Sequence, residues 1–121
     1  MARVSRDYRK LQVWDKAHAL TLMIYEHTKM FPREELYGLT SQMRRAAASV
    51  PTNVAEGCGR GGNIELARFM TIAEGSGSEL SYLLILARDL KFLSDVVANE
   101  LMEKTTEVCR MLAAYSAKLA S

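Results

Sequence analysis

Residues 69–90 read FMTIAEGSGSELSYLLILARDL, and this stretch decides the fold of the chain. Its apolar residues recur at helical spacing, so one row is expected to face a core. That row is Phe69, Ala73, Leu80, Leu83, Leu84, Ala87 and Leu90. We predict a helix from Asn63, which would serve as the N-cap, to about Leu93, running through Gly75 and Gly77. The alternative is a loop at the two glycines that splits the helix.

The opposite side of this helix is also apolar. The run from Tyr82 to Ala87 covers its whole circumference, and a bundle of four helices buries only one side. We therefore expect Tyr82, Ile85 and Leu86 to be covered by another subunit. A glycine inside a helix costs about 1 kcal/mol against alanine. We interpret Gly75 and Gly77 as positions that another backbone approaches closely.

Two helices are predicted before this one. The first spans about Val13 to Met30 and stops at Phe31-Pro32, because the residue before a proline avoids the helical region. The second spans Leu39 to Cys58, and Pro51 inside it predicts a kink. The expected buried positions are Val13, Ala17, Leu20 and Ile24 in the first helix, and Leu39, Met43, Ala46, Val50 and Val54 in the second.

The links between helices are short. Residues 57–63 are rich in glycine, and we interpret them as a helix–helix turn. An anion-binding loop at the start of the third helix is the alternative, but no strand precedes it and no P-loop pattern is present. Ser94 or Asp95 is expected to cap a fourth helix. The prediction is a single all-α domain, residues 1–121, folded as an antiparallel up-down-up-down four-helix bundle.

Composition and residue spacing indicate that this bundle carries neither a catalytic site nor a metal site. His18 and His27 are nine residues apart, which places them on opposite faces of one helix and separates them as metal ligands. No catalytic grouping and no cofactor motif is present, so we expect neither an enzyme, nor a metal site, nor a small-molecule substrate. The two cysteines and the lack of a long apolar run predict a cytoplasmic protein with reduced thiols and no membrane span.

Positive charge is concentrated in the first half of the chain. Residues 1–60 carry 10 basic and 6 acidic residues, whereas residues 61–121 carry 6 basic and 8 acidic ones. We predict that residues 1–10 form a basic N-terminal arm that meets phosphates. The candidate nucleic-acid-binding residues are Arg3, Arg6, Arg9 and Lys10, extended by Arg44, Arg45 and Arg60. The alternative is that the arm is only a solubilising tail.

The second helix offers a flat face of small residues opposite its buried row. With Tyr82, Ile85 and Leu86, the expected oligomer interface comprises Arg45, Ser49, Thr52 and Glu56. Glu56 and Arg60 have the spacing of a helical ion pair, which is either solvated or part of that interface. In the first helix, Trp14 and Tyr25 are expected to anchor a core or an interface rather than to stack a ligand.

Several motifs resemble a known family. They are Leu11-x-Val13-Trp14, Phe31-Pro32-x-x-Glu35, Leu39-x-x-Gln42-x-Arg44-Arg45-Ala46, Ser49-x-Pro51-x-Asn53-x-Ala55-Glu56-Gly57, Arg60, Phe69 and Ala73-x-Gly75-Ser76-x-x-Glu79-Leu80. The pattern resembles the four-helix-bundle family associated with intervening sequences in bacterial 23S ribosomal RNA genes. It is also similar to the accessory variability protein of diversity-generating retroelements. The resemblance is most specific between Gln42 and Leu80, and it is broken at Gly77, where a larger residue is expected.

The resemblance implies a bundle that assembles as a ring, with five protomers expected, and it supplies no catalytic residues. Two functions follow. The first is a non-catalytic homo-oligomer that binds nucleic acid, RNA in preference to DNA, through basic surface residues. The second is an oligomeric scaffold with no nucleic-acid role. Arg44, Asn53, Glu56 and Arg60 stand at motif positions of the family, where a structural and a functional role both remain open.

Overall fold

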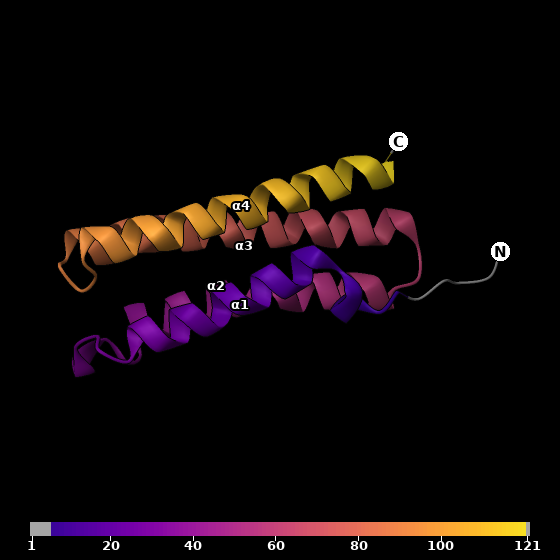
Figure 1. Ribbon diagram of the computed structural model, residues 1–121. Coiled ribbons are helices and arrows are strands. Elements are labelled where there is room, and N and C mark those ends of the chain that lie inside the picture. Colours follow the sequence, from indigo (N-terminus) through magenta and orange to yellow (C-terminus); the bar gives the residue numbers. More distant parts are fainter. Residues whose placement is uncertain (1–5, 121) are drawn as a thin grey trace.

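The computed structural model describes residues 6–120, and this part of the chain contains helices and no strand. The long helices are α1 (Gln12–Thr28), α2 (Leu39–Gly59), α3 (Asn63–Asp89) and α4 (Asp95–Ala120), with short 3₁₀ helices η1 (Tyr8–Lys10) and η2 (Arg33–Glu35) (Figure 1). The predicted all-α four-helix bundle is confirmed. Among the described residues, no helix is both long enough and apolar enough to cross a membrane.

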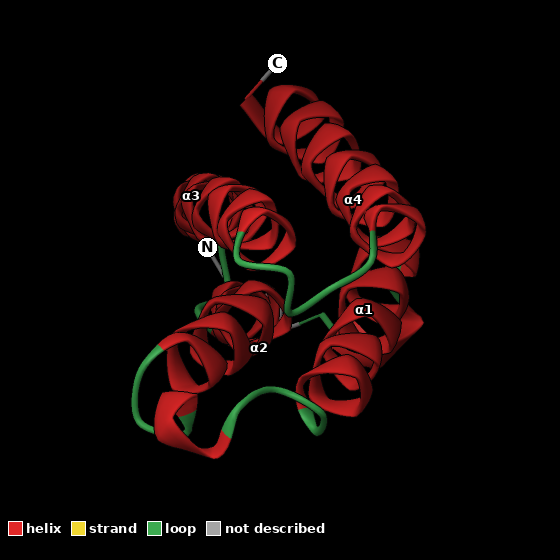
Figure 2. Cartoon of the chain, turned by 90° about the vertical axis from the view of Figure 1, so that its left-hand side faces the viewer, coloured by secondary structure: helices red, strands yellow, loops and turns green. Residues whose placement is uncertain are grey.

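The four helices form a closed arrangement in which each packs against two others. Viewed along the bundle, α1 and α3 each lie between α2 and α4 (Figure 2). The α1–α2 and α3–α4 links lie at one end of the bundle, which we call the link end (Figure 1). The start of α1, the α2–α3 turn and the last turns of α4 lie at the opposite end, which we call the terminal end.

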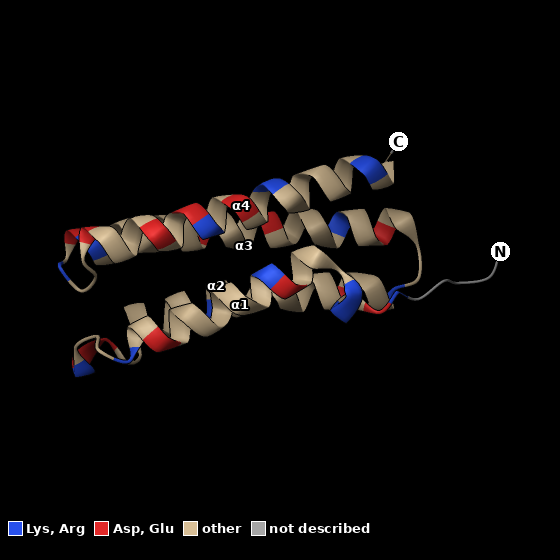
Figure 3. Cartoon of the chain, in the orientation of Figure 1, with Lys and Arg blue, Asp and Glu red and all other residues tan. Residues whose placement is uncertain are grey.

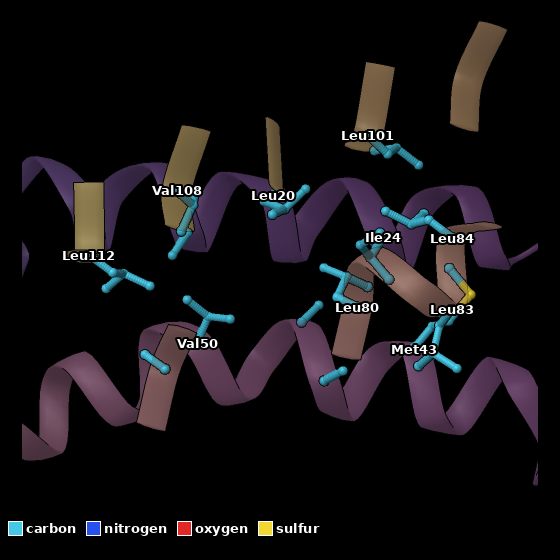
Figure 4. Close-up of a cluster of buried hydrophobic side chains, with 14 of the residues drawn as sticks. Leu20, Ile24, Met43, Val50, Leu80, Leu83, Leu84, Leu101, Val108 and Leu112 are labelled. Carbon is cyan, nitrogen blue, oxygen red and sulfur yellow. The ribbon is translucent and has the colours of Figure 1, made fainter. Parts of the chain in front are cut away.

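The core follows the predicted rows closely. Every predicted core position of α1 and α2 is buried, and side chains from all four helices meet in the interior (Figure 4). Leu90 is the exception, because it is 47% exposed. The helix ends at Asp89, four residues earlier than predicted, and Lys91 then turns the chain with a φ of 69°.

The predicted N-cap residue is wrong for α3 and right for α4. Gly62, not Asn63, is the N-cap residue of α3, and no side chain caps this end. Asn63 is instead the first residue of the helix, and its side chain accepts a hydrogen bond from Arg6. At the start of α4, the Ser94 hydroxyl accepts from the Val97 amide at 3.1 Å, which confirms the predicted cap.

The two glycines inside α3 have different surroundings. Helix α3 runs through Gly75 and Gly77 as predicted, but the reason for Gly77 was wrong. Gly77 is buried, and a Cβ there would meet Cys109 of α4, so the close approach occurs within one protomer. Gly75 is exposed with open space around it. Pro51 is buried inside α2, which continues past it; the predicted kink stays a prediction.

Candidate nucleic-acid interface

Basic residues lie at both ends of the bundle, and those at the terminal end come from residues 6–10 and from the segments on either side of the α2–α3 turn (Figure 3). Residues 8–10 form η1, which packs against α1 and α2, and the Arg6 amide donates to the Cys58 carbonyl at 3.3 Å. The Arg6 guanidinium donates to Asn63 Oδ1 at 2.8 Å, which ties this segment to the start of α3. Residues 6–10 are therefore part of the bundle rather than a separate arm, while Arg3 lies outside the described residues.

Two further arginines, one before and one after the α2–α3 turn in the sequence, lie against one buried ring. Phe69 is 6% exposed, and the guanidinium carbons of Arg60 and Arg68 lie 5.2 and 4.7 Å from its ring centroid. Cations over an aromatic face are attracted by the ring quadrupole. The ring therefore holds two positive side chains at the surface of the terminal end.

Sequence reasoning missed Arg68. In the structure, Arg68 pairs with Glu65 at 3.0 Å. Only the packing of α3 on α2 reveals that Arg68 shares Phe69 with Arg60. The sequence signal that could have found it was the placement of a phenylalanine beside an arginine, just after the glycine-rich turn.

Acidic partners accompany three of these cations. Arg9 donates to Asp7 from Nε at 3.0 Å, which with the Arg9 amide lowers the pKa of the Asp7 carboxyl. The hydrogen bond from Arg68 likewise lowers the pKa of Glu65, and Arg60 pairs with Glu56 at 2.9 Å. All three pairs are exposed, and such pairs contribute little to stability. Breaking any one of these ion pairs therefore costs the fold little.

Arg44 and Arg45 are not brought to the terminal end. They lie fifteen or sixteen residues before Arg60 on α2, which is about 23 Å along a helix. The Arg44 guanidinium donates to Thr28 Oγ1 at 2.9 Å and to the Tyr25 carbonyl at 3.4 Å, both in the last turns of α1. Arg44 thus holds α1 against α2, whereas Arg45 is exposed.

The predicted interface residues divide between the surface and the interior. Tyr82 is 59% and Ile85 36% exposed on α3, while Leu86 is half-buried. On α2, Arg45, Thr52 and Glu56 are exposed. Ser49 instead faces α3, where its hydroxyl lies 2.7 Å from that of Ser76, and it also accepts from Asn53 Nδ2 at 3.0 Å. Ser49 therefore joins α2 to α3 within the protomer, and Asn53 orients its hydroxyl from the same helix.

The described residues show little support for a metal site or a reactive thiol. They contain no group of three histidine, cysteine or acidic side chains placed to hold a metal ion. Burial raises the pKa of the thiols of both Cys58 and Cys109, so neither is readily ionised at neutral pH. A thiol that stays protonated is a poor nucleophile.

Comparison with known proteins agrees with this architecture. A crystal structure of a protein of unknown function from the S23 ribosomal protein family of Bacteroides thetaiotaomicron VPI-5482 superposes with a TM-score of 0.75. It shares 18% sequence identity and covers 84% of this chain and 95% of its own, so the likeness shows the fold. No curated protein matches the sequence. Residues 9–114 match the family described as 23S rRNA-intervening sequence protein, and the chain therefore belongs to that family.

Proposed function

We propose that this protein is a non-catalytic homo-oligomer that binds nucleic acid, RNA in preference to DNA, through the terminal end of its bundle. The observation that supports the proposal is the grouping of Arg6, Arg9, Lys10, Arg60 and Arg68 around the α2–α3 turn. The acidic residues of α4 lie mainly in its first half, toward the link end (Figure 3). A polyanion therefore meets its most favourable surface at the terminal end.

Assembly multiplies this modest charge. One chain carries a net charge of +2, so a ring of five would carry about +10. The outer face of α3 supports self-association, because Ile72, Tyr82 and Ile85 are exposed there. Gly75 supports it too, since a glycine in mid-helix has no steric reason within the protomer. A neighbouring subunit that packs on this face would bury all four residues.

Removing charge from the terminal end should weaken binding. A variant with Arg9→Ala, Lys10→Ala and Arg68→Ala is expected to bind a labelled RNA at least about tenfold more weakly at low salt, measured by fluorescence anisotropy. On a single-stranded RNA, its log–log salt dependence should be flatter by up to about 2.1, because about 0.7 is lost per phosphate contact. These side chains are exposed, so the fold should survive.

A matched control variant removes the same number of positive charges from the other end of the bundle. Lys29→Ala, Arg33→Ala and Lys91→Ala remove three exposed cations from the link end and should leave RNA affinity close to that of the wild type. Equal loss in the two variants would mean that only net charge matters. A wild type that binds neither RNA nor DNA at low salt would contradict the proposal and favour the scaffold function.

A charge on the outer face of α3 should prevent assembly. The wild type is expected to be larger than a dimer at micromolar concentration by light scattering, and Ile85→Lys to shift it to monomer, because an unpaired charge buried at an interface costs several kcal/mol. Leu22→Lys is the control, since Leu22 is 58% exposed on α1, away from that face. A monomeric wild type, or an Ile85→Lys protein that still assembles, would contradict the proposed oligomer.

A further inference from the structure

Three aromatic rings contact one another in series at the start of α1, and two of them are stacked in parallel. Trp14 and His18 are one helical turn apart, with ring centroids at 4.9 Å and planes only 9° from parallel. Tyr8 of η1 packs on Trp14 at 5.2 Å, tilted by 60°. Tyr8 and Trp14 are half-buried against the core, whereas His18 is exposed. The stack is therefore fixed at its inner rings and ends in a ring that solvent reaches.

Positive charge borders the stack directly. The Arg9 guanidinium lies 5.8 Å from the Tyr8 ring centroid, and Lys10, next to it, is exposed. Arg6, Tyr8 and Arg9 also line a shallow hollow of about 430 Å³ against the last turns of α2. The rings and the cations of the terminal end thus form one continuous surface.

The aromatic surface continues along the same side of α1. Residues 14, 18, 22 and 25 follow the helical spacing that places side chains in one row. Leu22 is 58% and Tyr25 44% exposed, and the Arg44 guanidinium lies 4.8 Å from the Tyr25 ring centroid. The row therefore presents apolar and aromatic side chains that are flanked by guanidinium groups at both ends.

We propose that the aromatic row of Tyr8, Trp14, His18 and Tyr25 stacks the unpaired bases of a single strand on its exposed rings, His18 and Tyr25. Tyr8 and Trp14 support these rings from the core side, while Arg9 and Lys10 hold the phosphates of the strand. The inference rests on the proposed function and specifies its ligand as single-stranded nucleic acid. Bases of a duplex are already stacked on one another, whereas those of a single strand offer free faces. Aromatic rings combined with a cationic track are the usual means of binding single strands.

This inference revises the sequence-based interpretation of Trp14. Trp14 does contact the core, as an anchor would, and its inward side is not available to a ligand. His18 changes the conclusion, because its parallel ring extends the Trp14 stack outward to solvent. A base that packs on His18 would lengthen an existing stack rather than require a new pocket.

Trp14 is the only tryptophan of the chain, so its fluorescence reports on this site alone. The ligands are a labelled oligouridine of about 12 nucleotides, an abasic strand of equal length and charge, and a duplex of that length. Anisotropy measures binding, and Trp14 emission measures stacking. The oligouridine is expected to quench Trp14 and to bind about tenfold more tightly than the abasic strand, whereas the duplex should leave the emission unchanged.

His18→Ala tests the exposed end of the stack without removing a core side chain. It should weaken oligouridine binding about tenfold and leave the abasic strand unaffected. His27→Ala, on the opposite face of α1, is the matched control and should change neither affinity. If oligouridine binds the wild type and His18→Ala equally, or no more tightly than the abasic strand, the stacking inference is wrong and the proposed function still stands. If anisotropy detects neither the two strands nor the duplex at low salt, both are overturned; if only the duplex binds, the stacking inference alone is wrong.

Discussion

Gly57→Ala is expected to destabilise the bundle by about 2 kcal/mol, although alanine is the better helix former. Gly57 is buried in α2, where a Cβ would lie 2.8 Å from the Cβ of Phe69 and 3.0 Å from Cδ1 of Leu66. The Phe69 Cβ is attached to the backbone of α3 and cannot rotate away. The two helices would have to separate, which would loosen the packing that holds Arg60 and Arg68 over Phe69.

Gly59→Ala is the matched control for this substitution. Gly59 lies two residues further along α2, and a Cβ there has no atom within 4 Å. The two free energies of unfolding are compared by urea titration at one fixed protein concentration, because the apparent stability of an oligomer depends on concentration. Gly59→Ala should change the free energy by less than about 0.5 kcal/mol. Equal changes in the free energy of unfolding for Gly57→Ala and Gly59→Ala would show that the close contact of α2 with α3 at Gly57 does not determine stability.

The sequence predicts the helices well because their signal is local. The apolar rows of α1 and α2 repeat at helical spacing, and burial follows that repeat without knowledge of the partner helix. The end of α3 has no such signal. Leu90 continues the apolar spacing, yet the chain turns at Lys91, a residue type that rarely adopts a positive φ. The structure alone supplies that boundary.

The candidate site depends on contacts between distant parts of the chain. Arg6 and Asn63 are 57 residues apart, so their hydrogen bond could not be read from spacing. Arg44 was grouped with the binding residues by charge, but its partners are Thr28 and the Tyr25 carbonyl at the end of α1. The Trp14–His18 stack is different, because its spacing is local and the sequence could have indicated it.

The contact between Gly77 of α3 and the Cys109 side chain of α4 sets how closely these two helices pack. A Cβ at Gly77 would overlap Sγ of Cys109, whose thiol in turn lies 4.0 Å from the Glu74 carbonyl. Cys109 is half-buried between α3 and α4 and can avoid a Cβ only by rotating about its single side-chain bond or by moving α4. A small residue at either position of this pair therefore relieves the contact.

Gly77→Ala is expected to cost about 2 kcal/mol in the wild type, and to become neutral or stabilising by up to about 1 kcal/mol in a Cys109→Ala background. With the thiol removed, only the helix preference for alanine remains. The four proteins of this cycle are compared by urea unfolding, and a coupling of about 2 to 3 kcal/mol would assign the close approach to Sγ. If Gly77→Ala costs the same with and without the Cys109 thiol, the close approach is made by the α4 backbone instead. In that case, Gly77 and not Cys109 would determine how closely α3 and α4 pack.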